Sequence, residues 1–239
     1  MKRDRDTSIT MKTLCVAVVV LSLSSVCRPA PLACDKLLKP VDKSPDLSGR
    51  WFVIAMSSDV CLIPALLNSL LWPSFAVDFT AQSTPNIYES NVTFKILDYC
   101  GAEPETIFFE RNILFDVDSN NAPIDTAEVL LHTGCPDCLI LKGNDSIDSL
   151  LLLSRRQKVT EAELKEFRMQ ADCLEWSEPE VLNSDHDYKN CKSFDDVEAT
   201  DEEIWNKMYE RLKETYNVPL QCLTKDIYDF SKALYAVTL

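Results

Sequence analysis

The chain has 239 residues, enough for one large domain or two small ones, and 46% of them are hydrophobic, which is ordinary for a chain that buries a core. It carries 24 Lys and Arg against 38 Asp and Glu, and the resulting charge of −14 disfavours nucleic acid and anionic membrane surfaces as partners. The sequence has only 4 Gly and 2 His, and it contains neither a GxGxxG nor a GxxxxGK[ST] phosphate loop. We therefore expect no cofactor and no metal.

The first 30 residues have the pattern of a secretory signal. Met11 and Lys12 precede an apolar stretch at residues 14–26, and small residues follow around Cys27 and Ala30. The apolar stretch is too short to span a membrane comfortably. We expect residues 1–30 to be a signal peptide, cut after Cys27 or Ala30, and the mature protein to be secreted and extracellular, with no transmembrane segment.

The cysteines and two glycosylation sequons fit the same compartment. Two of the ten cysteines lie in the signal, and an even number remains, which in a secreted chain predicts disulfide bonds. The sequons at Asn91 and Asn144 predict a glycoprotein. The eight remaining cysteines are Cys34, Cys61, Cys100, Cys135, Cys138, Cys173, Cys191 and Cys222.

Residues 49–154 are rich in β-forming residues that are arranged in short runs. The short connections favour antiparallel pairing of sequential strands, and the fourth run could extend to residue 117 and divide in two. We expect an all-β dominant fold, an eight-stranded antiparallel up-and-down barrel that leaves no open edge. The predicted strands are 49–57, 74–80, 87–97, 106–115, 126–133, 138–142 and 147–154.

Helices are predicted beside and after the barrel. Residues 62–72 form a short apolar helix that is either a lid at the barrel opening or part of the core. A capping box at residues 160–163 begins a flanking helix, and a second at 200–203 begins another, with a further helix at 219–239. We expect a barrel domain at 31–193 and a helical C-terminal extension at 194–239, which docks on the barrel, on a second chain or on a lipoprotein surface.

Two local patterns resemble the lipocalin signature. Gly49-Arg50-Trp51 begins the first strand, and Leu151-Leu152-Leu153-Ser154-Arg155 ends the last strand just before a capped helix. Residues 164–174 and the spacing from Cys173 to Cys191 are similar to the group of alpha-1-acid glycoprotein (orosomucoid) and apolipoprotein M, with the related fish saxitoxin- and tetrodotoxin-binding proteins.

The resemblance implies a barrel that is closed at one end. Trp51 would plug that end next to Gly49, and Arg155, with Arg156 as the alternative, would lie across the indole, an arrangement that stabilises by roughly 1–2 kcal/mol. It also implies the disulfides Cys34–Cys173 and Cys100–Cys191.

Alternating side chains predict an apolar interior. If Asn91 carries a glycan and faces outward, Val92 and Phe94 face inward. Arg111 alternates with inward residues, so it either binds the headgroup of a ligand or is exposed at the surface. The predicted ligand-binding residues are Val53, Ala55, Phe75, Val77, Phe79, Val92, Phe94, Ile107, Phe109, Arg111, Leu151 and Leu153.

These residues predict a carrier, not an enzyme, for a small hydrophobic or amphiphilic ligand such as a lipid, steroid, basic drug or toxin. One alternative is a lipocalin-type enzyme that uses a free thiol, for which Cys61 is the candidate. Another is an interaction protein that binds a partner or lipoprotein particles through its C-terminal helices. The CxxC of Cys135 and Cys138 lacks the helix that redox pairs use, so we expect a structural bridge there. Cys61 could pair with Cys222, or Cys135 and Cys138 could each pair elsewhere.

Overall fold

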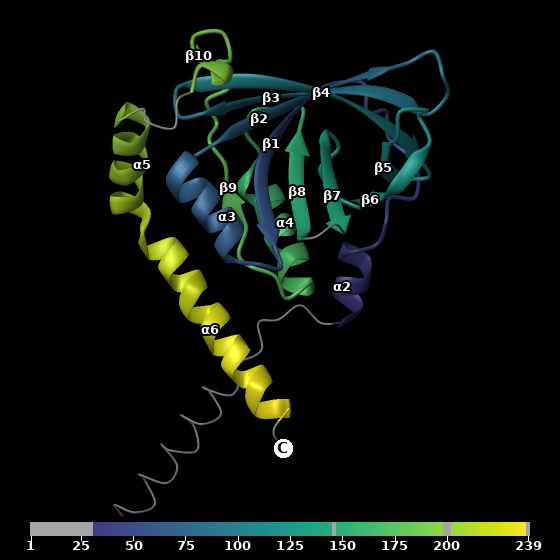
Figure 1. The fold of residues 1–239 in the computed structure, drawn as a ribbon. Coiled ribbons are helices and arrows are strands. Elements are labelled where there is room, and N and C mark those ends of the chain that lie inside the picture. The colour runs from purple at the N-terminus through teal and green to yellow at the C-terminus, as the bar shows by residue number, and fades with distance from the viewer. Residues whose placement is uncertain (1–30, 145–146, 198–201, 238–239) are drawn as a thin grey trace, which may run out of the picture.

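The computed structural model describes residues 31–144, 147–197 and 202–237, so the predicted signal peptide lies outside the described residues. Eight antiparallel strands close into a barrel, because β1 pairs with both β2 and β8, and β4 pairs with β5 as well as β3 (Figure 1). The predicted antiparallel barrel is confirmed. Its strands are β1 (Gly49–Ser58), β2 (Ser74–Ala81), β3 (Ile87–Ile96), β4 (Tyr99–Glu110), β5 (Ile113–Val117), β6 (Pro123–Leu131), β7 (Cys138–Asn144) and β8 (Asp148–Ser154).

The hairpin of β3 and β4 is longer than predicted. The strand expected to begin at residue 106 begins at Tyr99, because β4 pairs with β3 along its whole length, from Ile96↔Tyr99 to Ile87↔Phe108. Gly101 and Pro104 are unusual in a strand interior, but Pro104 lies where β4 pairs with β3 alone, at an edge that tolerates proline.

A β-bulge divides strand β1 into two registers. Pairing with β8 shifts between Val53 and Ala55, and a shift of one residue turns every later side chain to the opposite face. Ala55 therefore packs in the cluster outside the barrel, and Met56 lines the interior. The sequence predicted Ala55 inside the barrel, because strict alternation does not account for a bulge.

Two helices cover the outside of the barrel. Helix α4 (Glu161–Cys173) begins at the predicted capping box, in which Thr160 Oγ1 accepts from Glu163 N and Glu163 Oε2 accepts from Thr160 N. Phe167 of α4 is fully buried against β1, β7 and β8. Helix α2 (Pro31–Leu37) was not predicted. It is held to the barrel through Gln170, whose side-chain amide donates to Leu37 O and His132 O, both at 2.9 Å.

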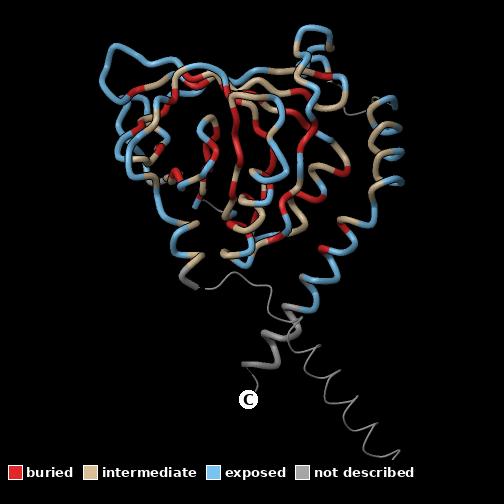
Figure 2. Tube along the Cα trace, turned by 180° about the vertical axis from the view of Figure 1, so that it is seen from behind, coloured by how far each residue is buried: buried red, intermediate tan, exposed pale blue. Residues whose placement is uncertain are grey.

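The remaining elements lie at the open end of the barrel and beyond it. Helix α3 (Leu62–Leu66) and the π-helix η1 (Leu67–Leu71) join β1 to β2. The C-terminal helix α5 (Glu202–Thr215) and the first turns of α6 (Asn217–Val237) lie beside this segment, and most of the residues there whose burial is described are exposed (Figures 1 and 2). Short strands β9 (Glu180–Val181) and β10 (Lys192–Ser193), with the 3-10 turn η2 (Phe194–Asp196), complete the chain, and no described helix is long and apolar enough to cross a membrane.

Four disulfides join these parts. Two of them link the pairs that the family resemblance implied, Cys34–Cys173 and Cys100–Cys191. Cys61–Cys222 joins α3 to α6 across 161 residues, and Cys135–Cys138 closes the CxxC segment just before β7. Both were among the pairings that the sequence left open.

Candidate binding cavity

One end of the barrel is closed by Trp51. Its indole is 4% exposed, and its Nε1 donates to Leu47 O at 2.7 Å. The guanidinium carbon of Arg155 lies 3.7 Å from the centroid of the indole ring, within the range of a cation–π contact. We call this end the base.

The Arg155 guanidinium also joins the chain segments that meet at the base. It donates to Ser48 O at 2.6 Å and to Arg50 O at 3.2 Å. Gly49 has a φ of +91°, which favours glycine, and a Cβ there would lie 2.9 Å from Arg155 Nη1 and would displace the guanidinium. Arg156 lies elsewhere and pairs with Asp137 (2.6 Å) and Glu163 (2.8 Å).

A cavity of about 510 Å³ extends from the interior above the base toward the open end. Its lower wall is made of apolar side chains from β1, β2, β4, β5, β7 and β8, most of which belong to one buried cluster with Trp51. Eight of the predicted residues line it: Val53, Phe75, Val77, Phe79, Val92, Ile107, Leu151 and Leu153.

The other four predicted residues do not line this cavity. Ala55 is turned outward by the bulge in β1. Phe109 is buried in the same cluster as Trp51 without bordering the cavity. Phe94 lies over Gly101, and its ring centroid is 5.2 Å from that of Phe194 in η2.

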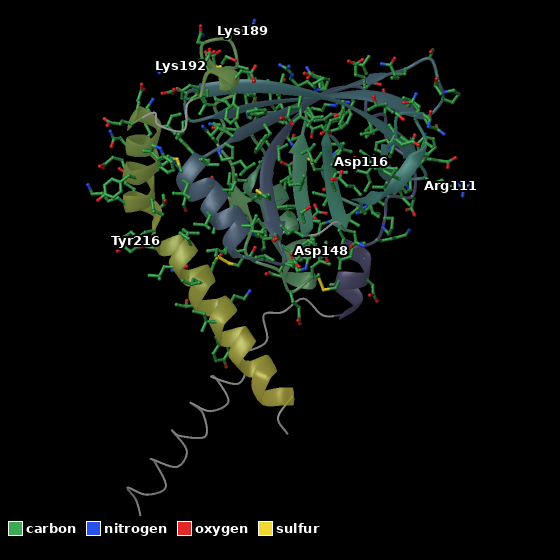
Figure 3. The ribbon with its side chains drawn as sticks, viewed as in Figure 1. Arg111, Asp116, Asp148, Lys189, Lys192 and Tyr216 are labelled. Atoms are coloured by element: carbon green, nitrogen blue, oxygen red, sulfur yellow. A yellow bond between two sulfur atoms is a disulfide. The ribbon has the colours of Figure 1, made fainter. Side chains whose placement is uncertain are left out.

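Arg111 differs most from the expectation. Strand β4 ends at Glu110, within the predicted run 106–115. Arg111 (φ 52°) and Asn112 (φ 68°) form a tight turn between β4 and β5, since a two-residue hairpin loop favours positive φ at both positions. Arg111 is exposed and points away from the barrel (Figure 3). The headgroup role that depended on an inward Arg111 is therefore wrong.

Three carboxylates border the cavity where the sequence predicted none. Glu105, Asp116 and Glu128 lie on the neighbouring strands β4, β5 and β6, and we call them the acidic band. Glu128 is half-buried, while Glu105 and Asp116 are more exposed, and Figure 3 shows Asp116 on the inner side of β5. Among the lining residues that the structure describes there is no Lys, Arg or His.

Burial and neighbouring carboxylates penalise the charged forms of Glu128 and Glu105. Burial raises the pKa of Glu128 above its ordinary value, and the charges of Asp116 and Glu105 raise it further. The pKa of Glu105 is raised by burial and by Asp116 and Glu103. This part of the cavity therefore favours a positive charge.

The acidic band was not predicted because the predicted strand limits excluded two of its residues and because β5 contains an irregular register. Glu105 and Asp116 each lie one residue outside the predicted run 106–115, and a register shift between Phe115 and Val117 turns both Phe115 and Asp116 toward the cavity. Glu128 alternates with the fully buried Leu130, and that signal could have placed its side chain inside.

The cysteines offer no free thiol to this cavity. All eight cysteines from Cys34 to Cys222 are paired, including Cys61, the candidate nucleophile. Cys135 and Cys138 lie close to Asp137 and Glu163 near the base, but the two sulfurs are bonded to each other and Arg156 binds both carboxylates.

The closed barrel, the sealed base and the flanking helix define a lipocalin fold. The ApoM domain model matches residues 114–195, which cover β5 to β10, so the predicted resemblance to the lipocalins of this group is confirmed.

Individual proteins are similar over longer stretches. Saxitoxin and tetrodotoxin-binding protein 1 of Takifugu pardalis is 26% identical over 181 residues, 69% of this chain, and the match spans only 46% of that relative's length. Among solved structures, the siderocalin Ex-FABP is 13% identical with a TM-score of 0.45 and covers 56% of this chain and 92% of its own. Lipocalin 12 from rat epididymis is 15% identical with a TM-score of 0.46, covering 61% and 91%.

Proposed function

We propose that this protein binds a small apolar or amphiphilic molecule in the barrel cavity and carries it without chemical change. The observation that supports this best is the cavity itself, about 510 Å³ in volume, with an apolar lower wall and a base sealed by Trp51 and Arg155. Pockets of this size commonly enclose one small ligand. Burial of its apolar surface contributes roughly 25 cal/mol per Å² before the costs of association.

The acidic band further favours a ligand with a cationic head. An apolar tail would lie on Val53, Phe79 and Leu153, and a positive head would lie beside Glu128, whose charged form is otherwise penalised by burial and by its acidic neighbours. The matched relative from Takifugu pardalis is named for binding saxitoxin and tetrodotoxin, so ligand binding by a similar chain adds support.

The setting of this function is an extracellular one. We propose a secreted glycoprotein with a barrel domain at 31–193 and a helical extension at 194–239. Asn91 lies between two cavity-facing neighbours on β3, Ser90 and Val92, at a position where a glycan would project outward. Asn144 ends β7 and borders the cavity at the open end, so a glycan there would stand beside the opening.

A set of ligands with one tail and different heads tests the proposal. N-phenylnaphthylamine, a neutral apolar dye that fluoresces when it is bound, would be displaced by dodecyltrimethylammonium, dodecyl maltoside or dodecyl sulfate, each below its micelle concentration. We expect saturable dye binding, and displacement that is strongest for the cation and weakest for the anion. Because the tails are the same, the difference reports on the head alone.

Glu128→Gln should reduce the preference for the cation about 5- to 10-fold and leave dye binding unchanged, as expected for loss of one charge-assisted contact. The matched control is Glu110→Gln, since Glu110 is exposed at the base end of β4 and does not line the cavity. Absence of saturable dye binding contradicts the carrier function. Tightest binding of dodecyl sulfate contradicts the cationic head alone.

A further inference from the structure

The segment that joins β1 to β2 forms part of the cavity wall. We call residues 62–72 the entrance segment, which comprises α3, η1 and Trp72 at the open end of the barrel. Leu67 of η1 lines the cavity. Trp72 then ends the helix in a left-handed conformation (φ 43°) and is 44% exposed. A movement of this segment would therefore change the cavity opening directly.

Helix α5 supplies a charged hydrogen-bond donor to the backbone of η1. Arg211 Nη2 donates to Asn68 O at 3.0 Å. The Thr215 hydroxyl lies 3.4 Å from Ser69 O, but its single hydrogen goes to the nearer Arg211 O, at 2.8 Å within α5. Carbonyls near the end of a short helix lack partners within it, so the Arg211 donor stabilises the helical form. The Arg211 guanidinium carbon also lies 4.3 Å from the centroid of the Trp72 ring, so a single side chain holds both η1 and the residue after it.

Two further connections hold the C-terminal helices at the open end of the barrel. Cys222 of α6 is bonded to Cys61, the residue before α3. On the far side of α5, Lys207 pairs with Asp98 in the turn between β3 and β4. The entrance segment and this turn lie at the same end of the barrel, since η1 leads into Ser74, which pairs with Lys95. Helix α5 therefore contacts two neighbouring connections at the open end, the one between β1 and β2 and the one between β3 and β4.

The contact between α5 and η1 leaves two buried polar atoms without a hydrogen bond. In the described part of the chain, Arg211 Nε and Asn68 Oδ1 are buried without a hydrogen-bond partner. A buried polar atom that leaves water without gaining a partner destabilises the contact. This cost brings the closed contact nearer in free energy to an open one, in which both atoms would be hydrated, while the Cys61–Cys222 disulfide keeps the two parts together.

We propose that α5 and α6 act as a clasp that holds the entrance segment against the cavity and sets the rate at which ligand enters and leaves. This inference rests on the proposed carrier function and assigns a role to the C-terminal extension. Arg211 and the disulfide are positioning elements, because they act on the ligand only through Leu67 and its neighbours.

The test compares full-length variants in two measurements. Arg211→Ala removes the donor to Asn68 and the contact with Trp72, and Cys61→Ser combined with Cys222→Ser removes the tether without leaving a free thiol. The matched control is Lys213→Ala, an exposed position on the same helix that contacts only its neighbour Glu210 among the described pairs. The first measurement is the dissociation rate of N-phenylnaphthylamine by stopped-flow fluorescence. The second is hydrogen exchange of the amides of residues 67–72 without ligand.

We expect dye dissociation to accelerate about 10-fold in Arg211→Ala, the size expected for one hydrogen bond to a charged group. It should also accelerate in the double serine variant, because α6 is then no longer tethered to the start of α3. The amides of residues 67–72 should exchange faster in both, with Lys213→Ala unchanged and far-ultraviolet dichroism native throughout. Unchanged amide exchange overturns the clasp whether or not dye binds. Faster amide exchange with an unchanged dissociation rate overturns its control of ligand exchange. Faster amide exchange in a protein that binds no dye supports the clasp and contradicts the carrier function alone.

Discussion

The base of the barrel stabilises the fold, whereas the acidic band destabilises it. At the base the Trp51 indole N–H and the Arg155 guanidinium donate to backbone carbonyls, and the cation lies over the ring. In the acidic band, burial and neighbouring carboxylates raise the pKa of Glu105 and of Glu128, and the described cavity lining contains no basic residue. Such a cost is typical of functional sites, which are stabilised by the rest of the molecule.

Removal of the plug should give the largest effect. Trp51→Ala deletes a buried aromatic side chain from the main core cluster and removes the surface on which Arg155 lies. We expect the free energy of unfolding to fall by about 3–5 kcal/mol, measured by urea denaturation. Tyr209→Ala, at a position that is 64% exposed, serves as the control and should change stability by less than about 0.5 kcal/mol. A similar small loss for Trp51→Ala would contradict the stabilising role of the base.

Substitution of the two neighbouring arginines compares the interaction at the base with an ordinary surface ion pair. Arg155→Met leaves the carbonyls of Ser48 and Arg50 without their donors and should cost about 2 kcal/mol. Arg156→Met removes ion pairs to Asp137 and Glu163 that are open to solvent and screened, so it should destabilise the protein clearly less than Arg155→Met. The comparison requires thermal or urea unfolding of both variants under one condition, and the reverse order would refute the distinction.

A substitution in the acidic band should have the smallest effect on the free energy of unfolding, and it should stabilise the protein. Because the pKa of Glu128 is raised in the folded state, its protonated form favours folding, and that contribution is lost as pH rises through the folded-state pKa. Glu128→Gln should therefore raise the free energy of unfolding at neutral pH by about 0.5–1 kcal/mol. The gain should vanish below the ordinary value of 4.5.

Urea denaturation of Glu128→Gln and wild type across this pH range measures that difference directly. Glu110→Gln, outside the cavity, should match wild type at every pH. A Glu128→Gln protein that is less stable than wild type at neutral pH would show that the carboxylate is stabilised by a partner, in contradiction to the mutual repulsion in the acidic band.

The sequence allowed much of the barrel to be predicted, because the relevant signals are local. Alternation along β2 placed Phe75, Val77 and Phe79 on the cavity face, and the hydroxyl and carboxylate of Thr160 and Glu163 marked the start of α4. The spacing of Trp51 and Arg155 was recognised only through the family resemblance, since nothing local joins residues that far apart.

The rest depended on how strands pair. The bulge in β1 places Met56 in the cavity wall in place of Ala55, and a two-residue turn places Arg111 outside the barrel. Both features follow from pairing with neighbouring strands. The acidic band has the same origin, because Asp116 reaches the cavity only through the register shift in β5. The contact between Arg211 and Trp72 joins residues that are distant in sequence, and no periodicity indicates it.

Mass spectrometry of the small molecules extracted from the natively secreted protein tests most directly whether the cavity holds a ligand. We expect one amphiphile with a cationic head, present in a one-to-one ratio with wild-type protein and lost from Val92→Trp, which would fill the cavity from β3. Wild-type protein that yields no stoichiometric small molecule, or a Val92→Trp protein that retains the same one, would contradict binding inside the barrel.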